Sequence, residues 1–264
     1  MSTELLYRVS EPLIAIVMLV LLLLATEFGY WKGFKSRERI SEAARSPIST
    51  ISGGTLGLLA LLLGFSFSMA LSRYELRTHL VMEESNAIGT TYLRSRLLPE
   101  PVNKEAASLL RQYVDTRVDF HRTVHDQTKL NELTNRTEEL QRQLWLRVPI
   151  AVEKDSRPST TGLFTQSLNE LIDIYGARRA AIDNHVPESI VFLLLCVSIM
   201  AVLGIGFVCG LGQQRNLFST VMLAVLLMLV MTAIIDLDRP RRGLIRVRED
   251  SMLRLQSTIT QEAQ

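Results

Sequence analysis

The sequence lacks the motifs of the common enzyme classes. GFSFS at 64–68 has no second glycine, which a nucleophile elbow requires. SGGTLG at 52–57 has no lysine and is not a phosphate-binding loop. No nucleic-acid module is present, and 29 basic residues are balanced by 27 acidic ones, for a net charge of +2. We therefore expect a protein that is not an enzyme and has no catalytic residue, cofactor, metal or nucleic-acid partner.

Cysteine is scarce, and strand signals are missing. The two cysteines, Cys196 and Cys209, fall in one apolar run, ~20 Å apart along a helix. They cannot pair within the chain and are expected to be small buried hydrophobes. The sequence contains no alternating strand pattern, repeat or low-complexity tract. These absences favour an all-α fold.

What the sequence does have is long apolar runs. A membrane-spanning helix needs ~20 mostly apolar residues, and four runs approach or reach that length. The first is followed by Glu27, Tyr30 and Trp31, which resembles an aromatic exit from a membrane more than a signal-peptide cleavage site. The four runs are Leu13–Ala25, Gly54–Leu71, Ile190–Leu211 and Leu217–Ile235.

These runs predict an all-α integral membrane protein with four transmembrane helices and a helical extramembrane domain between spans two and three. Residues 1–71 hold spans one and two with a basic connector at 31–47 that ends at Pro47. The other predicted parts are the extramembrane domain at 72–189, a transmembrane hairpin at 190–236 and a C-terminal tail at 237–264.

Helices account for most of the polar domain. Pro99 and Pro101 end the helix that continues from the second span. A second helix is predicted from about 103 to 147, and the stretch 131–135 is where a break in it would fall. A third is predicted from about 163 to 184.

The second span continues without proline from Gly57 to Leu98, ~60 Å of helix and about twice the hydrocarbon thickness. This helix is either a stalk or, in an oligomer, the lining of a pore and its vestibule. In the pore reading, a carboxylate ring would concentrate cations. In the stalk reading, the serines bond back to the helix and the glutamates pair with arginines of a neighbouring helix. The pore or selectivity candidates are Ser66, Ser68, Glu83, Glu84 and Asn86.

Other residues favour packing or anchoring. Two small-xxx-small pairs predict close helix contacts, which we expect within the subunit: Gly53 with Gly57, and Gly206 with Gly210. His121 and His125 share a helix face but lack a third ligand, which favours a solvated face over a metal site. A cluster of interfacial ion pairs, for which anchoring suffices as a role, is predicted from Glu27, Asp236, Asp238, Arg239 and Arg241.

Several stretches carry a family resemblance. They are Glu27, Gly29, Tyr30 and Gly33 at the first helix exit, GLLALLLGFSFSMALSRYE at 57–75, EESNAIGTTYLRSRLLPEP at 83–101, YVDTR at 113–117, LNELI at 168–172 and DLDRPRRG at 236–243. Together they resemble a bacterial family of four-span membrane proteins of unknown function, the bestrophin-like proteins. The resemblance implies a membrane protein of this layout. The label suggests a relation to calcium-gated anion channels, but no acidic calcium loop is present here.

The functional expectation is a homo-oligomeric ion channel, or channel-like protein, lined by the second transmembrane helix. The alternative is a non-conducting membrane scaffold or sensor whose helical domain binds a partner. Expected partners are the lipid bilayer, further copies of the chain, and ions. The resemblance to a bacterial family implies the bacterial inner membrane. Arginines near the membrane ends of the polar domain favour an orientation with the termini and helical domain in the cytoplasm.

Overall fold

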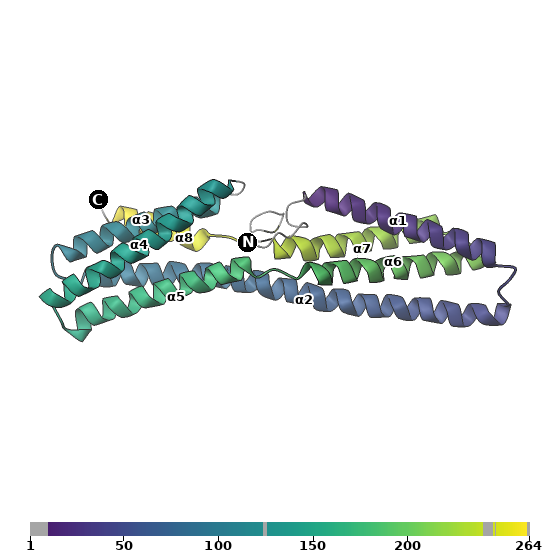
Figure 1. Cartoon of the computed structure of the whole chain (residues 1–264), viewed down its shortest axis with the longest axis horizontal. Helices are drawn as coiled ribbons and strands as arrows, with labels where there is room; N and C mark the ends of the chain where they lie inside the picture. The colour runs from purple at the N-terminus through teal and green to yellow at the C-terminus, as the bar shows by residue number, and fades with distance from the viewer. Residues whose placement is uncertain (1–9, 124–125, 240–244, 246, 263–264) are drawn as a thin grey trace. The chain divides into compact units, whose positions relative to one another are not determined.

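The structure, a computed structural model, describes residues 10–123, 126–239, 245 and 247–262. Within these ranges the chain forms α-helices and one short π-helix, and no strand. The elements (Figure 1) are α1 (Glu11–Ser36), α2 (Glu42–Ser95), α3 (Val102–Arg122), α4 (Gln127–Lys154), η2 (Pro158–Gly162), α5 (Leu163–Asp183), α6 (Glu188–Leu211), α7 (Leu217–Asp238) and α8 (Asp250–Gln261).

The described chain divides into two compact units. The membrane unit holds α1, α2 up to Arg73, α6 and α7, with Ile245. The helical unit holds α2 from Tyr74, followed by α3, α4, η2, α5 and α8. The second helix belongs to both units, because its 54 residues run without interruption from Glu42 to Ser95.

Four helical segments are long and apolar enough to cross a membrane, as the sequence predicts. The mean hydropathy of the most apolar window is 2.4 in α1, 1.9 in α2, 2.9 in the segment containing α6 and 2.6 in α7. Large apolar side chains cover the outside of this unit, among them Phe65, Phe192 and Phe218. Such exposure is the expected arrangement where lipid, and not water, is the solvent.

The tightest contact in the membrane unit joins α1 to α6. A β-carbon built on Gly29 or Gly33 of α1 would collide with the backbone carbonyl of Leu203 or Phe207. Reciprocally, a β-carbon on two glycines of α6 would collide with α1 carbonyls: Gly206 with Thr26, and Gly210 with Tyr30. Only glycine permits this backbone approach, which gives close van der Waals packing in lipid.

The helical unit has its own hydrophobic core. Leu110 and Tyr113 of α3, Leu140 and Leu144 of α4, and Leu168 of α5 are fully buried there. The part of α2 beyond Tyr74 forms one wall of this core through its own buried apolar residues, Ala87, Ile88 and Tyr92.

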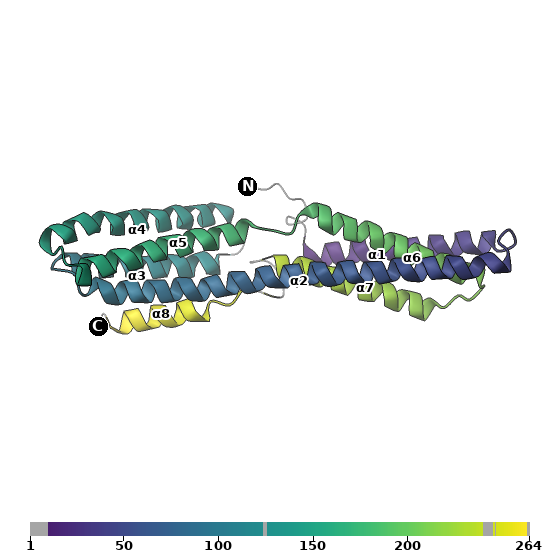
Figure 2. The ribbon, with the colours of Figure 1, turned by 90° about the horizontal axis from the view of Figure 1, so that it is seen from below.

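The last helix, α8, completes this unit, and the sequence did not predict it. It lies along α2 and α3 (Figure 2), with Leu255 against Gly89 and the buried side chains of Met252 and Ile259 in the core. Gln256 donates a 2.6 Å hydrogen bond to Asp115 of α3. The region expected to be a tail is therefore a structural element of the helical unit.

Two predicted boundaries are wrong. The break in the long polar helix falls after Arg122 and not at 131–135, because Asp126 caps the start of α4 by accepting from the Lys129 amide at 2.9 Å. Pro47 lies inside α2 and does not end the connector. Proline has no amide hydrogen, so Pro47 leaves the Ala43 carbonyl without a helical hydrogen bond. Ala43 is exposed near the start of the helix, where water can donate to this carbonyl, and the proline is therefore tolerated.

Candidate functional site

The most heavily charged feature of the helical unit is buried and centres on Glu84 of α2, whose side chain is 0% exposed. Arg117 of α3 donates to both carboxylate oxygens, from Nε to Oε1 at 2.7 Å and from Nη2 to Oε2 at 3.2 Å. Arg178 of α5 donates to Oε2 as well. One carboxylate thus joins three helices through charge-assisted hydrogen bonds, which are about twice as strong as neutral ones.

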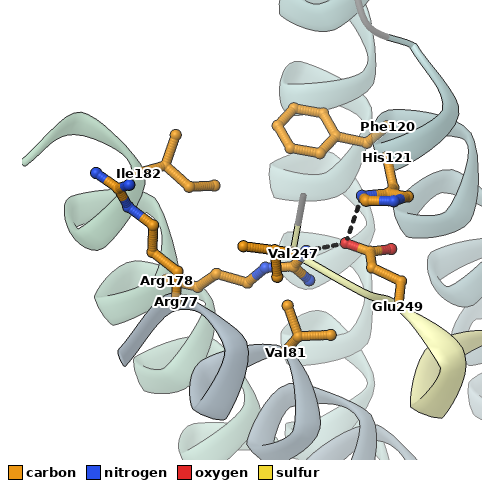
Figure 3. Close-up of a pocket in the computed structure, with 8 residues that line it drawn as sticks. All are labelled: Arg77, Val81, Phe120, His121, Arg178, Ile182, Val247 and Glu249. Atoms are coloured by element: carbon orange, nitrogen blue, oxygen red, sulfur yellow. Dashed lines mark hydrogen bonds and ion pairs between the residues drawn. The ribbon is translucent and has the colours of Figure 1, made fainter. Parts of the chain in front are cut away.

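A second carboxylate extends this network. Glu249, the residue before α8, accepts from Arg178 through Oε1. The same oxygen lies 3.2 Å from Nδ1 of His121 on α3 (Figure 3). Two carboxylates and two guanidinium groups therefore balance in charge, and all four side chains are at most 6% exposed. We call Glu84, Arg117, Arg178 and Glu249 the buried quartet.

Polar and aromatic side chains surround the quartet. The hydroxyl of Tyr113 donates to Glu84 Oε1 at 3.3 Å, and Gln141 of α4 donates to that hydroxyl at 3.1 Å. The Arg117 guanidinium lies over the Tyr175 ring, 5.1 Å from its centroid. These contacts satisfy groups that would otherwise be buried without partners, a costly condition.

The electrostatics keep both carboxylates ionised. Burial acts to raise the pKa of Glu84, but Arg117 and Arg178 outweigh it, and its pKa is lowered. Burial likewise opposes ionisation of Glu249, yet hydrogen bonding with His121 and the charge of Arg178 bring its pKa below the ordinary value. Burial, followed by the charge of Glu84, raises the pKa of Tyr113 well above its usual range. The quartet is therefore built from ion pairs at neutral pH.

A different feature marks the membrane part of α2. Gly53, Gly57, Ala60, Gly64 and Ser68 recur at helical spacing and are all exposed in the subunit. Among the described residues, a β-carbon on any of the three glycines would meet nothing within 4 Å. We call these five residues the open stripe. Gly53 and Gly57 were expected to pack within the subunit, and the structure gives them no such contact.

An apolar groove of about 620 Å³ includes Ala60 and Gly64 of the open stripe in its lining. Leu59 and Leu63 of α2 and Leu226 and Val230 of α7 are among its lining residues, all of which are apolar. Because no polar group faces it, this groove has the chemistry of a lipid-filled or protein-filled surface and not of an aqueous site.

The structure separates the predicted pore candidates. Ser68 and Asn86 are exposed, and Glu83 is 42% exposed with His79 Nδ1 3.4 Å away. Ser66 is buried within the membrane unit at 6% exposure. Glu84 reaches no aqueous surface of the chain, because its carboxylate is enclosed by arginines of neighbouring helices, the stalk arrangement anticipated above.

The predicted interfacial ion cluster also separates. Glu27 pairs with Arg215, 2.8 Å away in the α6–α7 loop before α7 begins. Asp236 and Asp238 lie at the other end of α7, where they accept the amides of Ile245 at 2.9 Å and Val186 at 2.7 Å.

Arg73 and His185 also lie within 4.0 Å of Asp238. Arg239 is buried at 4% exposure, whereas Arg241 lies outside the described residues. Asp236 and Asp238 therefore fix the chain around the end of α7, a role separate from that of Glu27.

The histidine pair contributes one described residue. His121 contacts Glu249, as above, and His125 lies outside the described residues. Over residues 10–123, 126–239, 245 and 247–262, no three His, Cys, Asp or Glu side chains are grouped closely enough to hold a metal ion.

Sequence reasoning missed Arg117 and Arg178 as partners of Glu84, and Glu249 as the second carboxylate that Arg178 binds. One signal was available. Arg117 lies between Val114 and Val118 on the buried face of α3, at a position where the helical repeat of apolar residues predicts an apolar side chain. A buried arginine requires a carboxylate partner, but nothing local to the sequence indicates which one.

The fold and these residues define a four-span α-helical membrane protein with a second helical unit built around buried ion pairs. The chain belongs to the Bestrophin-like family, whose domain model matches residues 19–252. No curated protein matched the chain.

Solved structures share the fold. The crystal structure of a bacterial bestrophin homologue from Klebsiella pneumoniae superposes with a TM-score of 0.66 at 18% identity, covering 92% of this chain and 95% of that one. A mutant of that homologue gives 0.65 at 18% identity, covering 93% and 96%. A variant described as a membrane protein gives 0.66 at 18% identity, covering 94% and 96%. At this identity the likeness establishes the fold alone.

Proposed function

We propose that the protein is a homo-oligomeric ion channel, or channel-like protein, whose path is lined by α2. The observation that carries this proposal is the open stripe. In the part of the chain that the structure describes, a β-carbon on Gly53, Gly57 or Gly64 would have no neighbour within 4 Å, although the opposite side of α2 is covered at Ser52, Leu59 and Leu63. Small exposed residues are what a helix needs where copies of it approach around an axis. Membership of a family named after bestrophins supports the same function.

The polar residues on this helix suggest how ions would pass. Ser68 ends the open stripe, and Asn86 follows it by 18 residues, five helical turns, so the two share one face of α2. Glu83 lies next to that face and is the remaining carboxylate candidate, since Glu84 is enclosed. In an oligomer Glu83 would repeat around the axis and favour cations.

Flux measurements on purified protein in liposomes, alongside the oligomeric mass, test the proposal. Ser68→Leu is expected to cut flux because it narrows and dries the path. The matched control is Ser219→Leu on α7, the same replacement at another exposed membrane position, which should leave flux unchanged. Equal flux in both variants would remove α2 as the lining helix, and a monodisperse monomer would remove the channel.

Glu83→Gln tests the selectivity part. The variant should still conduct but shift towards anions in asymmetric salt, most clearly at low ionic strength, where screening is weakest. An unchanged reversal potential in a conducting Glu83→Gln variant would exclude Glu83 from the selectivity ring.

The proposed location is the bacterial inner membrane, with the termini and helical unit in the cytoplasm. Reporters after Gln264 and near Ser159 should therefore report the cytoplasm, and one near Ser41 the opposite side. A periplasmic signal at Ser159 would reverse the proposed orientation.

A non-conducting scaffold or sensor is the second candidate, and one observation favours it. Trp145, Leu146 and Ile150 of α4 are 42%, 53% and 40% exposed, although the helical unit is not a lipid-facing helix bundle. Exposed large apolar side chains of this kind mark partner-binding surfaces. Wild-type protein that is folded and oligomeric but carries no flux would select this second function.

A further inference from the structure

A small cavity lies next to the buried quartet. It measures about 30 Å³ and is lined by residues of α2, α3, α5 and the segment leading into α8 (Figure 3). A water molecule requires roughly 10–15 Å³ of such volume, so the cavity has room for water and not for a larger molecule. Its lining residues are Arg77, Val81, Phe120, His121, Arg178, Ile182, Val247 and Glu249.

One polar atom in this cavity wall has no partner. Glu249 is 4% exposed, and its Oε1 atom receives Arg178 and His121. Its Oε2 atom is buried and has no hydrogen-bond partner among the described residues. A buried carboxylate oxygen without a donor is costly, so a ligand in the cavity that donates a hydrogen bond would be stabilising.

The surrounding charges select the kind of donor. From α2, Arg77 donates to the carbonyls of Ala181 at 3.0 Å and Asn184 at 2.9 Å, and its side chain lines the cavity. From α5, Arg178 contributes a second positive charge. Two guanidinium groups oppose a metal cation, and the carboxylate oxygen opposes an anion. A neutral water molecule is the donor that matches both size and charge.

We propose that the cavity binds a water molecule that donates to Glu249 Oε2, and that this water anchors α8 to the rest of the helical unit. Glu249 is the residue from which α8 starts. Its two oxygens would then be satisfied by three groups outside α8: the water, Arg178 and His121. The proposal concerns the helical unit alone and does not depend on ion conduction.

Filling the cavity tests the water. Val81→Ile adds one methyl group at a lining residue that is 2% exposed. If the cavity were empty, the added methyl would raise the melting temperature. If water is bound, the methyl group displaces it and leaves Glu249 Oε2 without a hydrogen-bond donor. The melting temperature then falls, and α8 amides exchange roughly tenfold faster.

Val118→Ile is the matched control, since Val118 is also 2% exposed but lies in the hydrophobic core. The proposal requires Val81→Ile to be more destabilising than Val118→Ile, and a stabilised Val81→Ile would overturn it. A high-resolution structure gives a direct second readout: water density within hydrogen-bond distance of Oε2 is expected, and an empty cavity there would also overturn it.

Discussion

Glu84→Gln is the substitution that most sharply tests the buried quartet. It preserves shape but leaves Arg117 and Arg178, at 2% and 5% exposure, with one carboxylate fewer between them. Removing one partner of a buried ion pair typically costs about 3–5 kcal/mol, because the remaining charge is uncompensated. Total stabilities of domains are about 5–15 kcal/mol, so the helical unit should lose a large fraction of its stability.

The adjacent residue supplies the control. Glu83→Gln makes the same chemical change one position earlier, where the side chain is 42% exposed, and should change stability by less than about 0.5 kcal/mol. The chain has two tryptophans, Trp31 in α1 and Trp145 in α4. In a Trp31→Phe background, the fluorescence of Trp145 reports urea unfolding of the helical unit. Wild type and variants with equal denaturant slopes can be compared directly.

A refuting result is equally definite. If Glu84→Gln and Glu83→Gln differ by less than about 1 kcal/mol in this assay, the quartet is not an energetic centre of the unit. Glu84 would then be available for another role, including the pore position first expected for it.

Three further outcomes follow from other contacts. The pKa of Glu84 lies below its ordinary 4.5. The stabilisation that ionised Glu84 contributes is therefore present above about pH 4.5 and lost as pH falls through the folded-state pKa. Acid unfolding curves of wild type should show this loss, and those of Glu84→Gln should not. Gly206→Ala should lower the melting temperature in detergent because its methyl meets the Thr26 carbonyl, whereas Gly57→Ala meets nothing within the subunit and should alter only self-association, read from oligomeric mass. Asp238→Asn should destabilise the membrane unit by about 2 kcal/mol, because it replaces a charged acceptor of the Val186 amide with a neutral one. Glu27→Gln, in an exposed pair with Arg215, should change the melting temperature little. Equal effects of the two substitutions would contradict the argument that burial makes the Asp238 contacts more important.

The membrane helices were predictable because the length of an apolar run is a local property of sequence. The continuation of α2 beyond its apolar part was also predictable, since no proline falls between Gly57 and Leu98, but its start before Pro47 was not. The missed elements depended on weaker signals. Asp126 was not recognised as the cap of a new helix, and α8 buries only Met252 and Ile259 among its 12 residues.

The buried quartet was less accessible to prediction. Glu83 and Glu84 are neighbours in sequence, yet a 100° rotation per residue directs them differently. Glu84 precedes Ile88 by one turn on the buried face of α2, and this apolar register was the available clue. Its partners come 33 and 94 residues later, and pairing over such distances depends on tertiary packing that one sequence does not reveal.

The glycine contact between α1 and α6 has a consequence for biosynthesis. The α6 backbone that Gly29 and Gly33 fit is made roughly 170 residues after them. At typical synthesis rates of about 5–20 residues per second, that interval lasts roughly 10 to 35 seconds. During it, the α1 of each nascent chain holds its bare backbone face towards lipid, open to any other small-residue helix nearby. Correct assembly thus depends on timing as well as on fit.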